Sequence, residues 1–209
     1  MNMKYIFINS LLFLAFISST TAQEQGQRFK AGFVFGLNAA QLDGDDLAGF
    51  NKLGLQGGLR AEAKLKEKTR LSFEILFSQR GSRSEIIANR FVEPRKLHLD
   101  YIEVPVIFNY LDWLSEDGFY KFHFHIGAAY SRLLNTKTDD DSFDELVNEF
   151  NKNNIGLLAG ATFYINEKFG LTVRYNRSVT LLFNNNKSTS VNAKSLLGYF
   201  LSFQGVYMF

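Results

Sequence analysis

The stretch Tyr120-Lys-Phe-His-Phe-His-Ile-Gly-Ala-Ala-Tyr130 carries the pattern on which the fold depends. Aromatic and aliphatic residues occupy every second position, with Lys121, His123, His125 and Gly127 between them. A period of two predicts a β-strand with one apolar and one polar face. The same alternation recurs in seven other stretches, at residues 29–38, 53–65, 71–80, 101–109, 154–163, 169–176 and 197–209. The sequence therefore predicts an all-β chain of eight strands.

The connections between these stretches alternate in length. Three are short, at residues 66–69, 112–118 and 166–168. Four are long and polar, at residues 39–52, 81–96, 133–153 and 182–195. Short periplasmic turns that alternate with long outer loops are typical of outer-membrane barrels. We therefore predict an eight-stranded antiparallel up-and-down transmembrane β-barrel, with both chain ends on the side of the short turns.

The two faces of the strands differ in composition. One face is rich in Phe, Leu, Ile and Tyr, whereas the other carries Gly together with Arg, Glu, Lys, His and Ser. The interior of an eight-stranded barrel is only just wide enough for side chains, so a polar network would fill it. The large apolar face then forms an outer band that suits lipid. A soluble periplasmic barrel of the lipocalin type, with the apolar face inward, is the alternative.

Residues 1–22 have the features of a secretory signal peptide. Lys4 provides the positive start, and residues 5–17 form an apolar run that is shorter than the ~20 residues of a spanning helix. Small residues lead up to a plausible cleavage site near Ala22. An uncleaved anchor is the alternative. We predict cleavage, an outer-membrane barrel domain over residues 23–209, and a location in the cell outer membrane.

The chain ends in Phe203-Gln-Gly-Val-Tyr-Met-Phe209, in which aromatic residues alternate up to the last position. This ending resembles the C-terminal signal by which outer-membrane barrels are recognised for insertion. Phe203, Tyr207 and Phe209 are the candidate signal residues, and the barrel-assembly machinery is the expected partner. An edge strand that happens to end in Phe is the alternative.

The composition narrows the function classes. The 209 residues include no cysteine, which excludes disulfides, a cysteine metal site and a lipoprotein anchor. The net charge is +2 without a basic stripe, which argues against a nucleic-acid partner. The sequence contains no Gly-x-Ser-x-Gly, P-loop or HExxH motif. We predict no enzyme activity and no cofactor.

The polar face supplies a candidate network inside the barrel. Its members are Arg60, Glu62, Glu74, Arg80, Glu103, His123, His125 and Arg174. Buried charges must be paired, so Glu103 is expected to pair with Arg60, Arg80 or Arg174. A plug that holds the barrel in shape is the favoured interpretation, and an ion path is the alternative. Pro105, beside Glu103, lacks an N–H group and suggests a bulge or bend.

Two groups of residues raise the question of a metal ion. His123 and His125 share a strand face, and with Glu103 they would make a two-histidine, one-carboxylate ligand set, although polar filling of the lumen is the simpler interpretation. Asp139, Asp140, Asp141, Asp144 and Glu145 cluster in the third long loop. The spacing of a Ca²⁺-binding EF-hand is missing, so a solvated loop or a short helix is favoured there. We predict no metal site.

Three stretches resemble the PorT-like outer-membrane β-barrel family of the Bacteroidetes. They are Lys30-Ala-Gly-Phe-Val-Phe-Gly-Leu-Asn38, Leu99-Asp-Tyr-Ile-Glu-Val-Pro-Val-Ile-Phe-Asn-Tyr110 and His125-Ile-Gly-Ala-Ala-Tyr130. The second is the most specific match, although Asn109 stands where Lys is frequent. The resemblance implies an eight-stranded outer-membrane barrel, and the founding member supports the export of secreted proteases.

These observations favour a non-enzymatic membrane barrel that acts through its loops and turns as a scaffold, an adhesin or an accessory of secretion. Its expected partners are outer-membrane lipid and a secretion-system or surface protein. A narrow channel, a small-ligand-binding barrel and a barrel enzyme are the alternatives.

Overall fold

The computed structural model describes residues 28–43, 52–83, 96–138, 150–184 and 195–209. These ranges form nine strands. They are β1 (Phe29–Asp43), β2 (Lys52–Lys66), β3 (Thr69–Arg83), β4 (Lys96–Leu114), β5 (Tyr120–Thr138), β6 (Asn153–Tyr164), β7 (Phe169–Ser178), β8 (Phe183–Asn184) and β9 (Ser195–Met208). Within these ranges, no helix is long and apolar enough to span a membrane.

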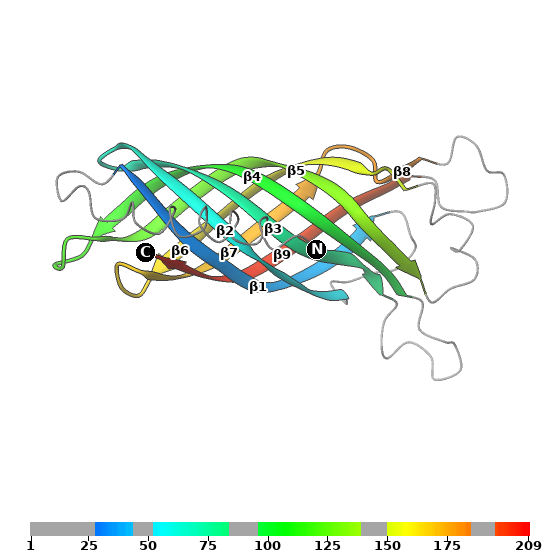
Figure 1. Cartoon of the computed structure of the whole chain (residues 1–209), viewed down its shortest axis with the longest axis horizontal. Helices are drawn as coiled ribbons and strands as arrows, with labels where there is room; N and C mark the ends of the chain where they lie inside the picture. The colour runs from blue at the N-terminus through cyan, green and yellow to red at the C-terminus, as the bar shows by residue number, and fades with distance from the viewer. Residues whose placement is uncertain (1–27, 44–51, 84–95, 139–149, 185–194) are drawn as a thin grey trace, which may run out of the picture.

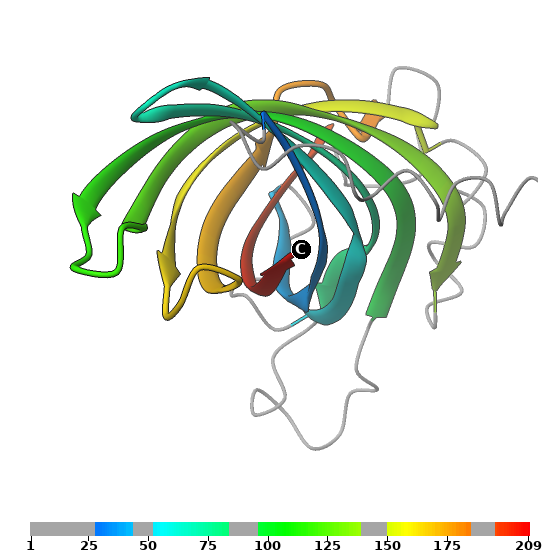
Figure 2. The same ribbon diagram turned by 60° about the vertical axis from the view of Figure 1, so that its left-hand side comes forward.

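Eight of the strands close into a barrel (Figure 1). Each strand from β1 to β6 pairs antiparallel with the next. β7 then pairs with β9, and β9 returns to pair with β1, where Gly36 lies opposite Gln204. Figure 2 shows the strands curving round a common interior, with the β4–β5 hairpin extending beyond its neighbours. The predicted eight-stranded antiparallel barrel is confirmed. Closure leaves no unpaired sheet edge, which the hydrocarbon layer of a membrane demands.

The strands are longer than the alternating stretches of sequence. β1 runs on to Asp43, β3 to Arg83 and β5 to Thr138, so each enters a segment that we predicted as loop. Ladder hydrogen bonds join backbone groups, so pairing continues beyond the residues whose side chains alternate between apolar and polar. The two-residue β8 adds to the start of β9 and was not predicted.

The region of Pro105 does not contain a shift in register. β3 and β4 keep one register on both sides of Pro105, where Phe73 pairs with Val106 and Leu76 pairs with Glu103. The register shift in β4 lies instead between Asp100 and Tyr101, against β5. Of the predicted bulge or bend at the proline, the bulge is therefore wrong in position, and the bend stays a prediction. A proline at a ladder position removes one donor without requiring an extra residue.

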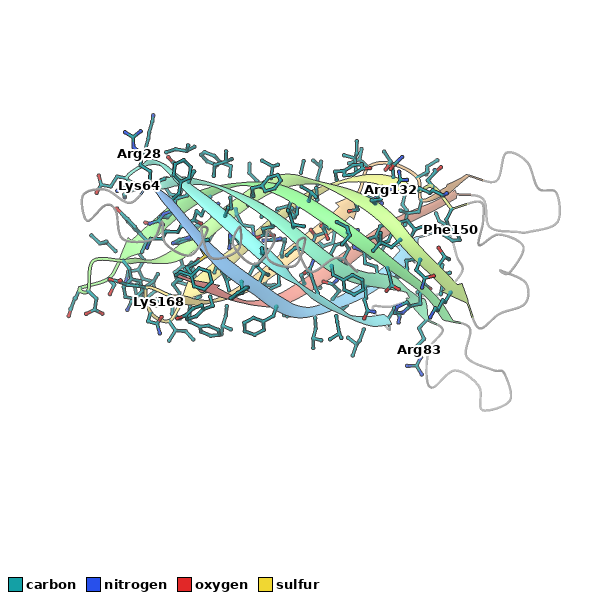
Figure 3. All side chains as sticks on the ribbon, viewed as in Figure 1. Arg28, Lys64, Arg83, Arg132, Phe150 and Lys168 are labelled. Atoms are coloured by element: carbon teal, nitrogen blue, oxygen red, sulfur yellow. The ribbon has the colours of Figure 1, made fainter. Side chains whose placement is uncertain are left out.

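The large apolar residues face outward along the middle of the barrel (Figure 3). Ile126 of β5 is 64% exposed and Leu157 of β6 is 59% exposed. Aromatic rings gather outside near the short turns, where Trp113 stacks on Phe122 at 5.7 Å and Phe33 meets Phe209 edge-on at 5.1 Å. An apolar band bordered by aromatic rings matches a lipid-facing surface. A lipocalin-like barrel would have the opposite arrangement.

Three clusters of buried apolar residues lie inside the barrel, the smallest of which consists of Ile107, Ala129 and Leu158. Near the short turns, one cluster consists of Val34, Leu76, Tyr164, Val206 and Met208, with Phe119 packed against it. Towards the long connections, another consists of Leu97, Leu99, Tyr101, Phe150, Leu182 and Leu196. The lumen is therefore not a continuous polar channel, because apolar side chains contribute to both of its ends.

Candidate functional site in the barrel lumen

All eight residues of the predicted polar network face the interior. Each is no more than 8% exposed, although each sits on a strand whose alternate residues face outward. Period-two geometry explains the placement, because successive side chains point to opposite faces of a strand. Their ion pairs fall into three groups along the barrel axis, each centred on a glutamate. Two of these groups, those of Glu74 and Glu62, are joined by a chain of hydrogen bonds from Arg60 through Asn109 and Ser72.

Glu74 of β3 is the centre of the middle group. Arg174 of β7 donates two hydrogen bonds to it across the lumen, from Nη1 to Oε2 at 2.9 Å and from Nη2 to Oε1 at 3.1 Å. The Nε of Arg60 lies 3.5 Å from Glu74 Oε1, and its Nη2 donates to Asn109 Oδ1 at 3.4 Å. Arg174 and Glu74 are fully buried. One carboxylate thus contacts two guanidinium groups, with Arg174 held in the better geometry.

Glu103 of β4 is the centre of the group nearer the long connections. It forms an ion pair with Arg80 of β3 and accepts a hydrogen bond from Gln56 Nε2 at 3.3 Å. The guanidinium of Arg80 also lies over the rings of Phe200, at 4.1 Å, and Tyr101, at 5.0 Å. Of the three expected partners of Glu103, the structure selects Arg80. The aromatic rings hold the guanidinium in place through cation–π contacts.

Glu62 of β2 is the centre of the third group, next to the short turns. Its Oε1 accepts from Arg70 Nη1 at 2.8 Å and its Oε2 accepts from Ser72 Oγ at 3.1 Å. The ring of His123 packs on Tyr164, with centroids 4.4 Å apart. Arg70 and Tyr164 were not among the residues predicted from the sequence. Arg70 continues the inward alternation of Ser72 and Glu74, and that pattern could have identified it.

The suggested ligand set of His123, His125 and Glu103 is not assembled. Glu103 lies opposite Ser131 on β5, six residues from His125, which corresponds to about 20 Å along a strand. Across the described ranges, no three His, Asp or Glu residues are grouped as metal ligands. His125 instead packs against Gly160, where a Cβ atom would come within 2.8 Å of its Nε2. Glycine at this position leaves the space that the imidazole occupies.

The middle of the lumen leaves little free volume. Two cavities near Arg80 measure about 10 Å³ each, which is close to the volume that one water molecule needs. A larger cavity of about 400 Å³ lies at the end with the short turns. Between these regions the ion pairs of Glu74 with Arg60 and Arg174 cross the lumen. The arrangement therefore resembles a plug with a cup at one end.

Several predicted features lie outside the described residues. They are the signal peptide of residues 1–22 with its cleavage near Ala22, and the acidic cluster from Asp139 to Glu145. The candidate insertion residues are described. Phe203, Tyr207 and Phe209 all point outward, and the ring of Phe209 packs on both Tyr207 and Phe33. Their part in insertion stays a prediction.

Comparison with protein families gives one match. The family described as "Outer membrane protein beta-barrel domain" matches residues 21–184, which is more than three quarters of the chain. A search of curated proteins finds no match.

Among solved structures, the attachment invasion locus protein Ail of Yersinia pestis has 12% identity and a TM-score of 0.47. Neisserial surface protein A has 16% identity and a TM-score of 0.47. The N-terminal barrel domain of Pseudomonas aeruginosa OprF has 10% identity and a TM-score of 0.39. Each alignment covers 88% of this chain and 100% of the other. The family match, not these structures, is the finding that bears on what the protein is.

Proposed function

The chain belongs to the outer membrane protein beta-barrel domain family, and from that premise we propose that it is a sealed, non-enzymatic barrel that works through its loops and turns. Support comes from the closed sheet, the outward apolar band and the filled lumen. Of these, the observation that carries the proposal is the filling of the lumen by the cluster of Glu74, Arg60 and Arg174. A barrel that is blocked at mid-height has only its two ends with which to act.

The two ends differ in a way that suggests their orientation. The turns at residues 67–68, 115–119 and 165–168 lie at the same end as Arg28, Lys64 and Lys168, while Arg83, Arg132 and Phe150 lie at the opposite end (Figure 3). Family barrels place short turns in the periplasm and long loops outside the cell. On this orientation the long loops are the contact surface, for a role as scaffold, adhesin or accessory of secretion.

Three finer assignments complete the proposal. The stretch from Leu99 to Tyr110 supports membership of the PorT-like branch found in Bacteroidetes. The apolar run at residues 5–17 supports export with cleavage near Ala22. The outward Phe209 supports recognition by the barrel-assembly machinery during insertion. Outer-membrane lipid and a surface or secretion-system protein are the proposed partners.

Shortening the loops tests where the function resides. In the test variants, residues 84–95 or residues 139–149 are replaced by an Asn-Gly turn, which suits a tight hairpin. We expect the variants to stay in the outer membrane and to keep the heat-dependent shift in gel mobility of a folded barrel, because the glutamates of the three lumen groups and the arginines that pair with them all lie on barrel strands.

The functional readout is attachment of cells to surfaces and the amount of protein secreted, compared with cells that lack the protein. Loss of either property with the barrel intact supports the proposal. A chain with both loops shortened that restores both properties in full would contradict it. The matched control replaces the short turn at residues 67–68 with Asn-Gly.

A further inference from the structure

The cavity at the end with the short turns forms a cup inside the mouth of the barrel, lined by residues of the strands and the short turns. It measures about 400 Å³, within the ~300–1,000 Å³ typical of small-molecule pockets. Its floor is made of the buried side chains Glu62, His123, Tyr164 and Met208. The apolar cluster of Val34, Leu76 and Val206 includes two of these floor residues, Tyr164 and Met208. A ligand in the cup would therefore enter and leave at the same end.

One wall of the cup is cationic. Lys30 on β1, Lys64 on β2 and Arg70 on β3 all line it. They are neighbours across the sheet, since Lys30 pairs in register with Glu62 and Lys64 pairs with Arg70. Glu62 has its two oxygens engaged by Arg70 and Ser72. In the described part of the chain, neither Lys30 nor Lys64 has a carboxylate within 4.0 Å. The two lysines of this wall are therefore not engaged in an ion pair within 4.0 Å, although the lining as a whole also includes Glu62, Glu67 and Glu167.

The rest of the cup provides aromatic rings and, at its rim, two carboxylates. Phe119, Tyr120 and Tyr164 supply aromatic surface, and an apolar body would replace water there favourably. Glu67 and Glu167 lie in exposed turns at the rim, where Glu67 accepts from Tyr120 Oη at 3.5 Å. These rim carboxylates repel a dianion more strongly than a monoanion.

We propose that the cup binds a monoanionic carboxylate carried on an aromatic body. Its carboxylate lies between Lys30 and Lys64, and its ring packs on Tyr120 and Phe119. Such a group occurs in small aromatic acids and at the end of a polypeptide, and both reach the cup from the side of the short turns. The site is separate from the long loops, so its test does not depend on their role.

Calorimetry on the full chain in detergent tests the site with probes that differ in charge. N-acetylphenylalanine carries the ring and the carboxylate, phenylalaninamide carries the ring and a positive charge, and inorganic phosphate carries no ring. We expect N-acetylphenylalanine to bind at least ten times more tightly than either of the others. A pentapeptide that ends in phenylalanine then distinguishes the sources, because a polypeptide site favours it over N-acetylphenylalanine and a metabolite site does not.

Variants of the two lysines test whether the cationic wall of the cup binds the carboxylate of the ligand. Lys30→Gln with Lys64→Gln should weaken binding of N-acetylphenylalanine at least tenfold and remove its dependence on salt. The matched control, Lys168→Gln, changes a lysine at the same end of the barrel that does not line the cup, and should bind as the unmodified chain does. The heat-dependent gel shift verifies folding of each variant. Equal binding of all three charge probes, or no difference between the double variant and the control, would overturn the proposal.

Discussion

Replacing Arg174 by methionine should destabilise the barrel far more than the same replacement of Arg60. Both side chains are buried beside Glu74, yet only Arg174 donates two hydrogen bonds to it, at 2.9 and 3.1 Å. A hydrogen bond to a charged group contributes about 1.5–3 kcal/mol, so the loss of two gives about 3–6 kcal/mol. The range agrees with the cost of about 3–5 kcal/mol for removing one partner of a buried pair.

Arg60→Met should cost no more than about 1 kcal/mol, because it removes a long contact and leaves the Arg174 pair intact. The Nε of Arg60 is 3.5 Å from Glu74, and among the described residues neither Nε nor Nη1 has a hydrogen-bond partner. Removing a poorly satisfied buried cation also removes part of its desolvation cost. The two variants are therefore matched in chemistry and differ in geometry.

Urea unfolding in lipid vesicles measures the free energy of unfolding of the Arg174→Met and Arg60→Met variants. Trp113 is the single tryptophan of the chain, lies on the outer face and stacks on Phe122, so its emission reports the passage from lipid to water. The midpoint and the slope give the change in unfolding free energy. The reasoning is refuted if Arg60→Met costs as much as Arg174→Met, or if Arg174→Met costs less than about 1 kcal/mol.

Three further substitutions test the outer face, the interior and the chain end. Ile126→Arg puts a charge on the lipid side in the middle of β5 and should cost about 2–4 kcal/mol in the same unfolding assay. Gly160→Ala brings a Cβ into steric overlap with the backbone oxygen of Val173 and to 2.8 Å from His125 Nε2, and should cost about 1–3 kcal/mol. The control Gly57→Ala, whose nearest contact is 3.4 Å, should be close to neutral, and equal effects would contradict the packing argument. Phe209→Ala should slow insertion into vesicles that carry the assembly machinery, and an unchanged insertion rate would exclude Phe209 as a signal.

Alternation allowed the barrel to be predicted because a strand assigns its faces one residue at a time. It placed Glu103 and Arg80 inside, but it left Arg80 as one partner among three. Which arginine pairs with Glu103 depends on the register between neighbouring strands of the closed sheet. That register cannot be derived from the sequence where a long loop joins two strands, and the uncertainty accumulates around the barrel.

The same limit hid the cup from sequence analysis. Lys30, Lys64 and Arg70 come from three strands and meet only through the pairing register. The metal hypothesis failed for the same reason, because His125 and Glu103 share a lumen but lie about 20 Å apart along it. Residue type and face can be predicted from one strand, whereas height along the barrel cannot.

Conductance in a planar bilayer tests the central claim, a lumen sealed at mid-height, most directly. The purified full chain should insert without steady current steps, because the cluster of Glu74, Arg60 and Arg174 crosses the lumen. A variant with alanine at these three positions is the positive control and should show steps. Stable current steps from the unmodified chain, at a size like that of the control, would contradict a sealed barrel and make the protein a narrow channel.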